Sequence, residues 1–401
     1  MAPRHVLVPL VRPRSGNAVG ALSCVFVLHA VLTASWAPRI PAVEQHLRLN
    51  DAQFGIALAG EPLAEMAAAL LTGRFVATHG SKIALRWLLP AFCLAAPLPG
   101  IAVSQLTLFW CLAAWGALGG ATNIAMNAQA VLQESAGGRL MLSRLHGLWS
   151  LGALVGAALG TLAGGAGIPV WLQLGATGLA GLTGSQACVS GLVDGRVEAQ
   201  DPAPSRPAAG VRPGVVLVLL AVIYFCAQFA EGSADTWSAA FFAESSRVRV
   251  GLGGIGYAAY AMSMCCGRLA GDRIVRRFGP AATVRCSALI AAIGFGSALL
   301  WPGIASGLAG LMLLGLGFST VIPLVIRATS QVPTAVASRS LGAVTSAGSV
   351  GMVCGPPLIG LVAAAAPLPA ALGLVVASAA VVAVAAPAVR VAGGAERPGH
   401  R

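Results

Sequence analysis

The sequence predicts an all-α polytopic membrane protein with twelve transmembrane helices in two six-helix bundles. Apolar runs of about twenty residues recur along the chain, and about twenty helical residues span a hydrocarbon core of about 30 Å. Hydrophobic residues make up 57% of the 401 residues and charged residues only 9%. A soluble chain would carry about 25% charged residues to cover its surface. We therefore expect lipid to cover this one.

Charge is confined to the short gaps between the apolar runs, and these gaps define the spans in order. The first six expected spans are 17–38, 52–73, 84–104, 106–133, 145–166 and 169–191. A hydrophilic stretch rich in Pro, Ala and Gly follows at 192–213 and reads as a flexible cytoplasmic linker. The last six are 214–242, 251–271, 281–301, 303–327, 337–364 and 368–389. The expected domains are therefore residues 1–191, the linker 192–213, and residues 214–401 with a short cytoplasmic tail.

The basic residues predict the orientation, because Lys and Arg keep loops on the cytoplasmic side during insertion. With the N-terminus inside, the only cations left outside are Arg39, Arg48, Arg247 and Arg249. Both termini are then cytoplasmic. The net charge of +12 is scattered through loops among acidic residues, so no contiguous basic face predicts a nucleic-acid partner. The expected partner of these cations is the lipid bilayer.

An internal repeat supports two equivalent halves. An offset of about 200 residues brings matching residues to the same place in the order of spans, where spans two and eight end. The first-half residues are Arg74, Gly80 and Arg86, and their counterparts are Arg273, Gly279 and Arg285. Trp36 likewise falls close to Trp237.

One motif at these positions resembles a family signature. Gly267, Arg268, Gly271, Asp272 and Arg273, followed by Phe278 and Gly279, resemble the G-x-x-x-D-R-x-G cytoplasmic-loop signature of the major facilitator superfamily. In the first half the counterpart is Gly73, Arg74, His79, Gly80 and Lys82, but Ala77 stands where the signature has Asp. The resemblance implies gating loops that carry Arg74, Gly80, Gly267, Arg268, Asp272 and Arg273.

Further segments, at 35–41, 145–152, 230–237 and 355–357, resemble a poorly characterised bacterial inner-membrane branch of this superfamily that is similar to sugar permeases. The resemblance implies a multi-pass protein of the bacterial plasma membrane that works as a monomer on a small-molecule substrate. It does not supply the identity of that substrate.

The seventh span carries a polar face. Tyr224, Gln228, Glu231 and Asp235 follow one another at steps of four, three and four residues, so they share one side of a helix. Burying a carboxylate in hydrocarbon is costly, which predicts that this face lines a central cavity. The alternatives are that Asp235 is interfacial and that Glu231 bonds to a neighbouring helix.

The second span carries Glu61 and Glu65, four residues apart, and Pro62 follows Glu61. Two close carboxylates in a low dielectric do not both ionise readily, so one is expected to hold a proton at neutral pH. A proton-coupled carrier needs such a group. The pair could instead contact substrate, or hold the two halves together by hydrogen bonds.

Other candidates lie on spans one and four. His29 could titrate or pair with a carboxylate, or it could be a satisfied structural group. Arg39, just past span one, is expected to act as an outer gate or to contact lipid headgroups. Asn123 and Asn127 offer donors and acceptors suited to hydroxyl groups, with bonding between helices as the alternative. A glycine stripe in span five predicts close helix packing: Gly152, Gly156, Gly160 and Gly164.

No Walker A, H-E-x-x-H or triad-like pattern occurs, and the nine cysteines form no C-x-x-C pair. We therefore expect no enzyme, cofactor or metal site. The leading hypothesis is a secondary transporter that moves a small polar, sugar-like solute by alternating access, driven by protons. Efflux of drug-like or secondary-metabolite compounds is the alternative, and a membrane sensor on a transporter scaffold is a third.

Overall fold

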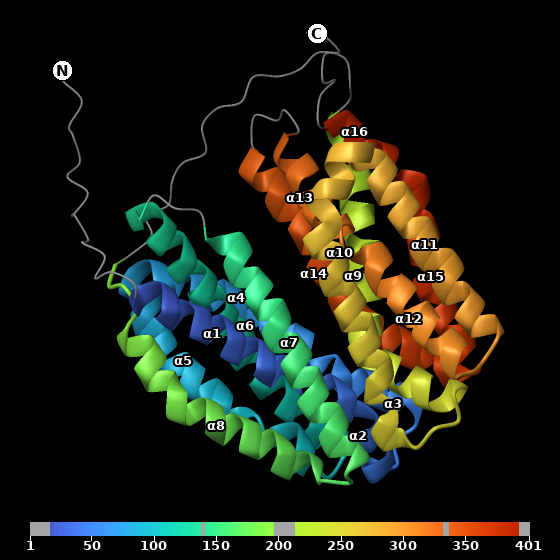
Figure 1. Ribbon diagram of the computed structural model, residues 1–401, viewed down its shortest axis with the longest axis horizontal. Coiled ribbons are helices and arrows are strands. Elements are labelled where there is room, and N and C mark those ends of the chain that lie inside the picture. Colours follow the sequence, from blue (N-terminus) through green and yellow to red (C-terminus); the bar gives the residue numbers. More distant parts are fainter. Residues whose placement is uncertain (1–16, 138–140, 196–212, 332–336, 393–401) are drawn as a thin grey trace.

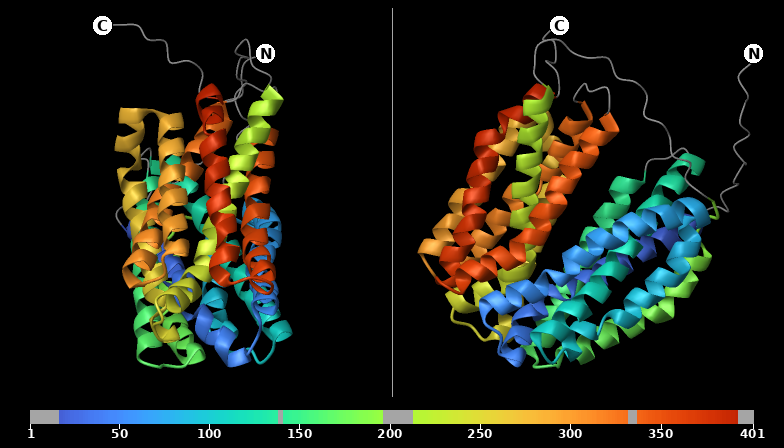
Figure 2. Two further views of the ribbon diagram at one scale, coloured as in Figure 1. Left: turned by 90° about the vertical axis from the view of Figure 1, so that its right-hand side faces the viewer. Right: turned by 180° about the vertical axis from the view of Figure 1, so that it is seen from behind.

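The computed structural model describes residues 17–137, 141–195, 213–331 and 337–392, which are almost entirely helical. Residues 17–190 form one bundle and residues 213–392 form the other (Figure 1). The two bundles approach each other at the lower end of the view and diverge toward the upper end, as the view from behind also shows (Figure 2). The expected linker lies largely outside the described residues, so the domain boundaries stay a prediction.

The first bundle contains eight α-helices and two 3-10 turns. In chain order they are α1 (Asn17–Ala34), η1 (Ala37–Arg39), α2 (Ile40–Leu47), α3 (Asp51–Leu58), α4 (Gly60–His79), α5 (Ser81–Ala95), η2 (Leu98–Ile101), α6 (Gln105–Gly137), α7 (Leu142–Gly165) and α8 (Val170–Ser190).

The described part of the second bundle contains eight α-helices and one 3-10 turn. It contains α9 (Pro213–Ser245), η3 (Val250–Leu252), α10 (Gly254–Phe278), α11 (Pro280–Leu300), α12 (Ile304–Phe318), α13 (Val321–Gln331), α14 (Ala337–Ala363), α15 (Leu368–Ala385) and α16 (Pro387–Ala392).

Within the described residues, ten helical segments are long and apolar enough to cross a membrane. They coincide with ten of the twelve expected spans, and α8 and α10 occupy the places of the other two. Five cationic or acidic residues at 268–277 make α10 the least apolar of the long helices. The all-helical, two-bundle prediction is confirmed.

Span two is interrupted. α3 begins with a capping box, in which the Asn50 side chain accepts a hydrogen bond from Gln53 N (2.9 Å) and the Gln53 side chain accepts one from Asn50 N (3.2 Å). It ends at Leu58, and α4 starts at Gly60. Pro62 therefore lies in the first turn of α4, where its missing N–H leaves no bond unmade. The proline thus marks a helix start.

The predicted repeat has the same backbone geometry in both halves. Gly80, between α4 and α5, has φ +93°, and Gly279, between α10 and α11, has φ +78°. Each donates its N–H to the carbonyl four residues earlier, at 2.8 Å in both cases. A residue with a Cβ would be strained at this φ, which explains why glycine occupies both positions.

At the lower end, residues of the two bundles touch. Phe54 of α3 packs edge to face on Trp237 of α9, with ring centroids 6.2 Å apart. A Cβ on Gly55 would come within 2.7 Å of Pro356 O in α14. A Cβ on Gly164 of α7 would come equally close to Gly251 O in η3. Two backbone crossings and one aromatic pair therefore close this end.

The glycine stripe of α7 packs as predicted. A Cβ on Gly152 would lie 2.7 Å from Val27 O of α1, and one on Gly160 would lie 2.6 Å from Ser35 O. The absence of side chains lets α7 lie directly against the backbone of α1.

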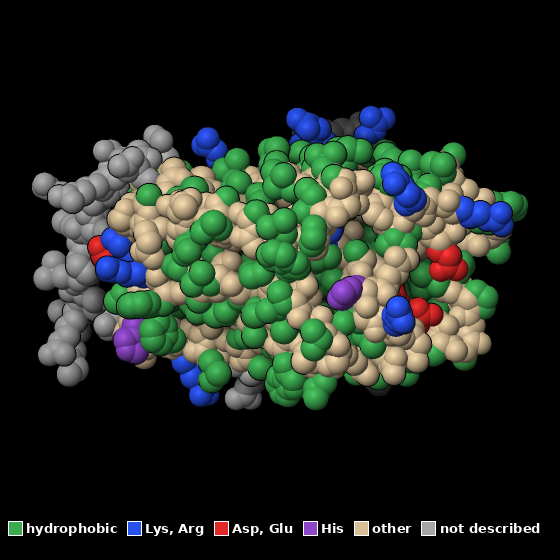
Figure 3. Space-filling model, turned by 90° about the horizontal axis from the view of Figure 1, so that it is seen from below, with side chains coloured by type: hydrophobic (Ala, Val, Ile, Leu, Met, Phe, Trp, Pro, Cys, Tyr) green, Lys and Arg blue, Asp and Glu red, His purple; other side chains and the backbone are tan. Residues whose placement is uncertain are grey.

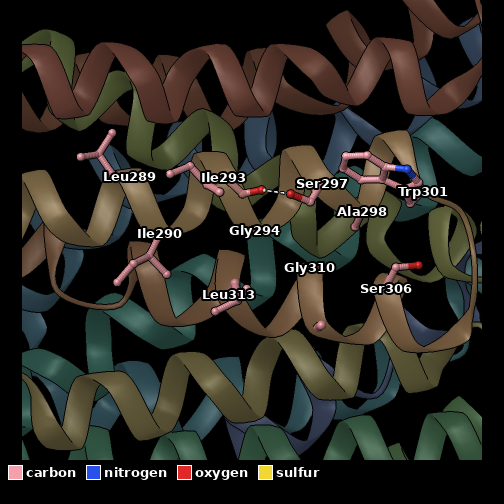
Figure 4. Close-up of a pocket in the computed structure, with 11 residues that line it drawn as sticks. Leu289, Ile290, Ile293, Gly294, Ser297, Ala298, Trp301, Ser306, Gly310 and Leu313 are labelled. Carbon is pink, nitrogen blue, oxygen red and sulfur yellow. Dashed lines mark hydrogen bonds between the residues drawn. The ribbon is translucent and has the colours of Figure 1, made fainter.

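The membrane-facing surface includes an apolar groove of about 470 Å³ between α11 and α12 (Figure 4). Ile293 and Trp301 on its rim are 68% and 66% exposed. Ser297, the polar side chain in the middle of the groove, donates its hydroxyl to Ile293 O of its own helix (2.7 Å). Such a surface suits contact with lipid chains.

Candidate functional site

Carboxylates of both bundles come together between α4 and α9. Glu61 and Glu65 lie on α4, and Glu231 and Asp235 lie on α9. The charge of Glu61 interacts with those of Glu65 and Asp235, so the group bridges the two bundles. The acidic residues expected on spans two and seven are therefore within electrostatic reach of one another.

An arginine neutralises part of this acidic group. Arg268 of α10 donates from Nη2 to Glu231 Oε1 at 3.0 Å, and its charge also acts on Asp235. The Arg268 and Glu231 side chains are 36% and 21% exposed. A charge-assisted bond of this kind holds α10 to α9 and fixes the carboxylate. Glu61, Glu65 and Asp235 have no such ion pair among the described residues.

Two tyrosines of α10 complete this side. Tyr257 and Tyr260 are 8% and 3% exposed, and both interact with the charges of Glu231 and Asp235. The Tyr260 hydroxyl has no hydrogen-bond partner in the described part of the chain. Neither tyrosine was predicted to be a site residue, although Tyr257, Tyr260 and Arg268 lie at spacings of three and eight and thus on one helix face.

Two glycines of α6 determine how closely α4 approaches. A Cβ on Gly116 would lie 2.5 Å from Glu61 O and 2.8 Å from Glu61 Cα. Gly120 lies one turn later, and a Cβ added there would be 3.1 Å from Glu65 Cα. Because one glycine faces the backbone of each glutamate, the α4 backbone rests directly on α6 at both positions.

Aromatic side chains of the first bundle add apolar surface and unused donors. Trp36 and Trp115 lie edge to face with centroids 6.5 Å apart, and Phe92 stacks on Trp115 at 5.5 Å. All three are at most 3% exposed. Neither indole N–H has a partner among the described residues. Buried donors without partners are costly unless something else satisfies them.

His29 is fully engaged within the first bundle. Its Nε2 bonds Gly119 O of α6 (3.1 Å), and its Nδ1 accepts from Trp149 Nε1 of α7 (3.2 Å). Accepting at Nδ1 requires the neutral tautomer with its proton on Nε2. The side chain is 5% exposed. These contacts favour the structural alternative for His29.

The remaining polar candidates bond locally or pack between helices. Asn127 Nδ2 donates to Asn123 Oδ1 (2.8 Å) and to Asn123 O (2.9 Å), so this pair binds itself along α6. Tyr224 and Gln228 of α9 lie against Gly348 of α14. They pack at the α9–α14 contact within the second bundle.

The residues expected in gating loops lie at helix ends or within α10. Arg74 and Arg273 are exposed near the upper ends of α4 and α10. Gly80 forms the turn after α4. Gly267 lies against Ser319, because a Cβ added at Gly267 would be 2.7 Å from the Cβ of Ser319. The side chain of Asp272 lies outside the described part of the structure.

Two helical bundles with acidic, cationic and aromatic groups between them define a polytopic membrane transporter. The chain belongs to the major facilitator superfamily, whose family model matches residues 22–356. An uncharacterised MFS-type transporter of Yersinia pestis is 32% identical over 87% of this chain and 90% of its own length. The membrane protein MosC of Rhizobium meliloti is 28% identical over 92% and 90%.

Solved structures show the same fold. The nucleoside transporter NupG matches with a TM-score of 0.71 at 13% identity, over 94% of this chain and 99% of that one. A bacterial homologue of the human lysosomal transporter Spinster, in an inward-facing and occupied conformation, matches with 0.67 at 15%, over 93% and 96%. At these identities the likeness extends to the fold alone.

Proposed function

We propose that this protein is a proton-coupled secondary transporter that moves a small polar solute by alternating access. The observation that carries the proposal is the group formed by Glu61 of the first bundle with Asp235 and the Arg268–Glu231 pair of the second. A carboxylate between two moving bundles can exchange its proton with opposite sides of the membrane as the bundles rock.

The arrangement of the bundles supports a cytoplasm-facing conformation. The basic residues at the ends of α4 and α10 lie at the upper, diverging end, and the positive-inside rule assigns that end to the cytoplasm. Both termini are then cytoplasmic, and the closed lower end faces outward. We propose that it works as a monomer in the bacterial inner membrane, with one pathway between its bundles.

Buried polar side chains without hydrogen-bond partners among the described residues favour a polyhydroxylated solute such as a sugar. The indole N–H groups of Trp36 and Trp115 and the hydroxyl of Tyr260 can donate, while the carboxylates of Glu61 and Asp235 can accept. Aromatic faces complement the apolar faces of a sugar ring. A site built to bond hydroxyl groups rejects ligands without them, because its buried polar groups would stay unpaired.

Proteoliposomes that enclose a pH-sensitive dye provide the test. We expect one or more of a panel of hexoses, pentoses and inositols to acidify the lumen when added outside, and each of Glu61→Gln and Asp235→Asn to abolish the acidification. Asp194→Asn is the matched control, because this carboxylate is 83% exposed and pairs with Lys82 away from the group. It should keep the flux.

Two results would count against the proposal. If Glu61→Gln and Asp235→Asn both transported with unchanged pH dependence, the carboxylates would not couple protons. If only lipophilic compounds moved protons, and moved them outward, the efflux alternative would replace the sugar-like substrate.

A further inference from the structure

A cavity of about 600 Å³ lies at the lower end, away from the carboxylates of the central group. Segments of both bundles line it: the η1–α2 corner, the η2 turn and the α7–α8 turn of the first, and Val250 and Gly251 of η3. Figure 3 views the molecule from this end, where charged side chains are sparse among hydrophobic ones.

The charged side chain in its wall is Arg39. This arginine, which was expected to act as an outer gate or to contact lipid headgroups, is 3% exposed. Its Nη2 donates to Ile168 O, and Nη1 makes a long contact of 3.5 Å with Gly160 O. Nε has no partner among the described residues. A guanidinium carries five N–H groups, so three remain unused.

No acidic side chain lines the cavity in the described residues, whereas His46 and Gln45 lie on its wall with Arg39. Glu44 of the same helix does not line the cavity, and the charges that act on it are those of Asp51 and Glu244. The C-terminal end of α7, near Gly164, offsets part of the Arg39 charge through its dipole. A buried cation with carbonyl contacts alone still lacks the counter-charge that buried charges normally have.

The position of the cavity indicates what supplies that charge. Trp171 lines it and is 51% exposed, as expected of a tryptophan at the level of lipid headgroups. Gly164 leaves room for the guanidinium, since a Cβ there would come within 2.9 Å of Arg39 Nη1. The planar fork of arginine matches the oxygens of a phosphate group.

We propose that this cavity binds a phosphate group of a lipid headgroup or a free phosphate anion, with Arg39 as its principal ligand. Because Val250 and Gly251 belong to the second bundle, the complete site exists only when the lower end is closed. Bound phosphate therefore stabilises that conformation.

Thermal unfolding in dodecyl maltoside micelles, which contain no phosphate, tests the site. One arm compares added phosphatidylglycerol with diacylglycerol of the same chains. The other compares sodium phosphate with sodium chloride at equal ionic strength. At saturating ligand we expect a rise in Tm of about 2–4 °C. A rise with phosphatidylglycerol alone identifies the headgroup, and a rise with inorganic phosphate identifies the free anion.

Arg39→Gln should lose the rise, and Arg48→Gln should keep it, because Arg48 is an exposed cation at the same end that does not line the cavity. Ala42→Leu narrows the cavity and leaves Arg39 intact, so it should also lose the rise, even if Arg39→Gln cannot be purified. The proposal is overturned if neither phosphate source raises the Tm of the wild type. It is equally overturned if Arg39→Gln or Ala42→Leu responds as the wild type does.

Discussion

Phe54 and Trp237 join the two bundles directly, since the rings of Phe54 on α3 and Trp237 on α9 pack edge to face with 6.2 Å between centroids. Both side chains are at most 1% exposed, and Trp237 Nε1 also donates to Pro356 O of α14 (3.3 Å). Asp235 precedes Trp237 by two residues, so the two side chains leave α9 on different sides. Opening the lower end must break the Phe54–Trp237 contact.

Phe54→Ala should favour opening of the lower end. An edge-to-face pair contributes about 1 kcal/mol beyond its buried area, which corresponds to about a fivefold change in the closing equilibrium. We expect faster hydrogen–deuterium exchange in α3 and in the lower half of α9. Phe241→Ala is the control, because Phe241 packs on Phe295 within one bundle. It should lower the Tm without changing exchange in α3, and equal exchange in both variants would contradict the prediction.

Gly55→Val should oppose closure of the lower end more strongly than Phe54→Ala does. The added Cβ would lie 2.7 Å from Pro356 O and 3.1 Å from Gly360 Cα, and these backbone atoms of α14 can move aside only at a cost in free energy. Pulsed electron paramagnetic resonance between labels at Arg48→Cys and Arg247→Cys, with the native cysteines replaced, should show longer distances. Gly20→Val is the control, because a Cβ there meets nothing within 4 Å. Identical distances in the two variants would exclude this role for Gly55.

The Arg268–Glu231 pair should show energetic coupling. Arg268→Gln and Glu231→Gln each leave one charge without its partner. The loss in free energy of unfolding of the double variant should therefore be smaller than the sum of the losses of the two single variants. Partial exposure places the coupling near the lower end of the usual range, about 1 kcal/mol. The Lys82–Asp194 pair has the same 3.0 Å separation but an 83% exposed carboxylate. Its coupling should be smaller, and additive losses at Arg268 and Glu231 would refute the prediction.

His29→Ala should destabilise the protein without altering proton coupling. Removing the imidazole leaves Gly119 O and Trp149 Nε1 unpaired in a buried place, at a cost of about 1–3 kcal/mol. Trp149→Phe removes one of the two bonds and should cost less. The Tm gives the stability, and dye-loaded proteoliposomes give the pH dependence of flux. A shift in that pH dependence would return His29 to the proton pathway.

Hydropathy and the repeat were sufficient to predict the helical architecture. A chain in lipid must satisfy its backbone within helices, so the length of an apolar run translates directly into a span. The shared offset of Gly80 and Gly279 located equivalent turns, and both have positive φ. The interruption at Ala59 was not predicted, because the apolar run continues across it.

The acidic faces of spans two and seven were found from their spacing, but their surroundings were not. Arg268 was assigned to a gating loop by its motif, whereas it lies in α10 and pairs with Glu231. Arg39 was expected to act as an outer gate or to contact lipid headgroups, and its burial beside η3 of the second bundle was not predicted. Both outcomes depend on which helices are neighbours, and a one-dimensional pattern of residue types contains no such information.

The break between α3 and α4 gives span two a joint of its own. Gly55 brings α3 against α14 of the second bundle, while Gly116 brings α6 of the first bundle against α4, so the two pieces of span two have different principal neighbours. Movement at the lower end can therefore be absorbed by rotation about Ala59 and Gly60, and α4 need not tilt with it. The backbone of Glu61 and Glu65 would then keep its contacts with α6 while the lower end opens and closes.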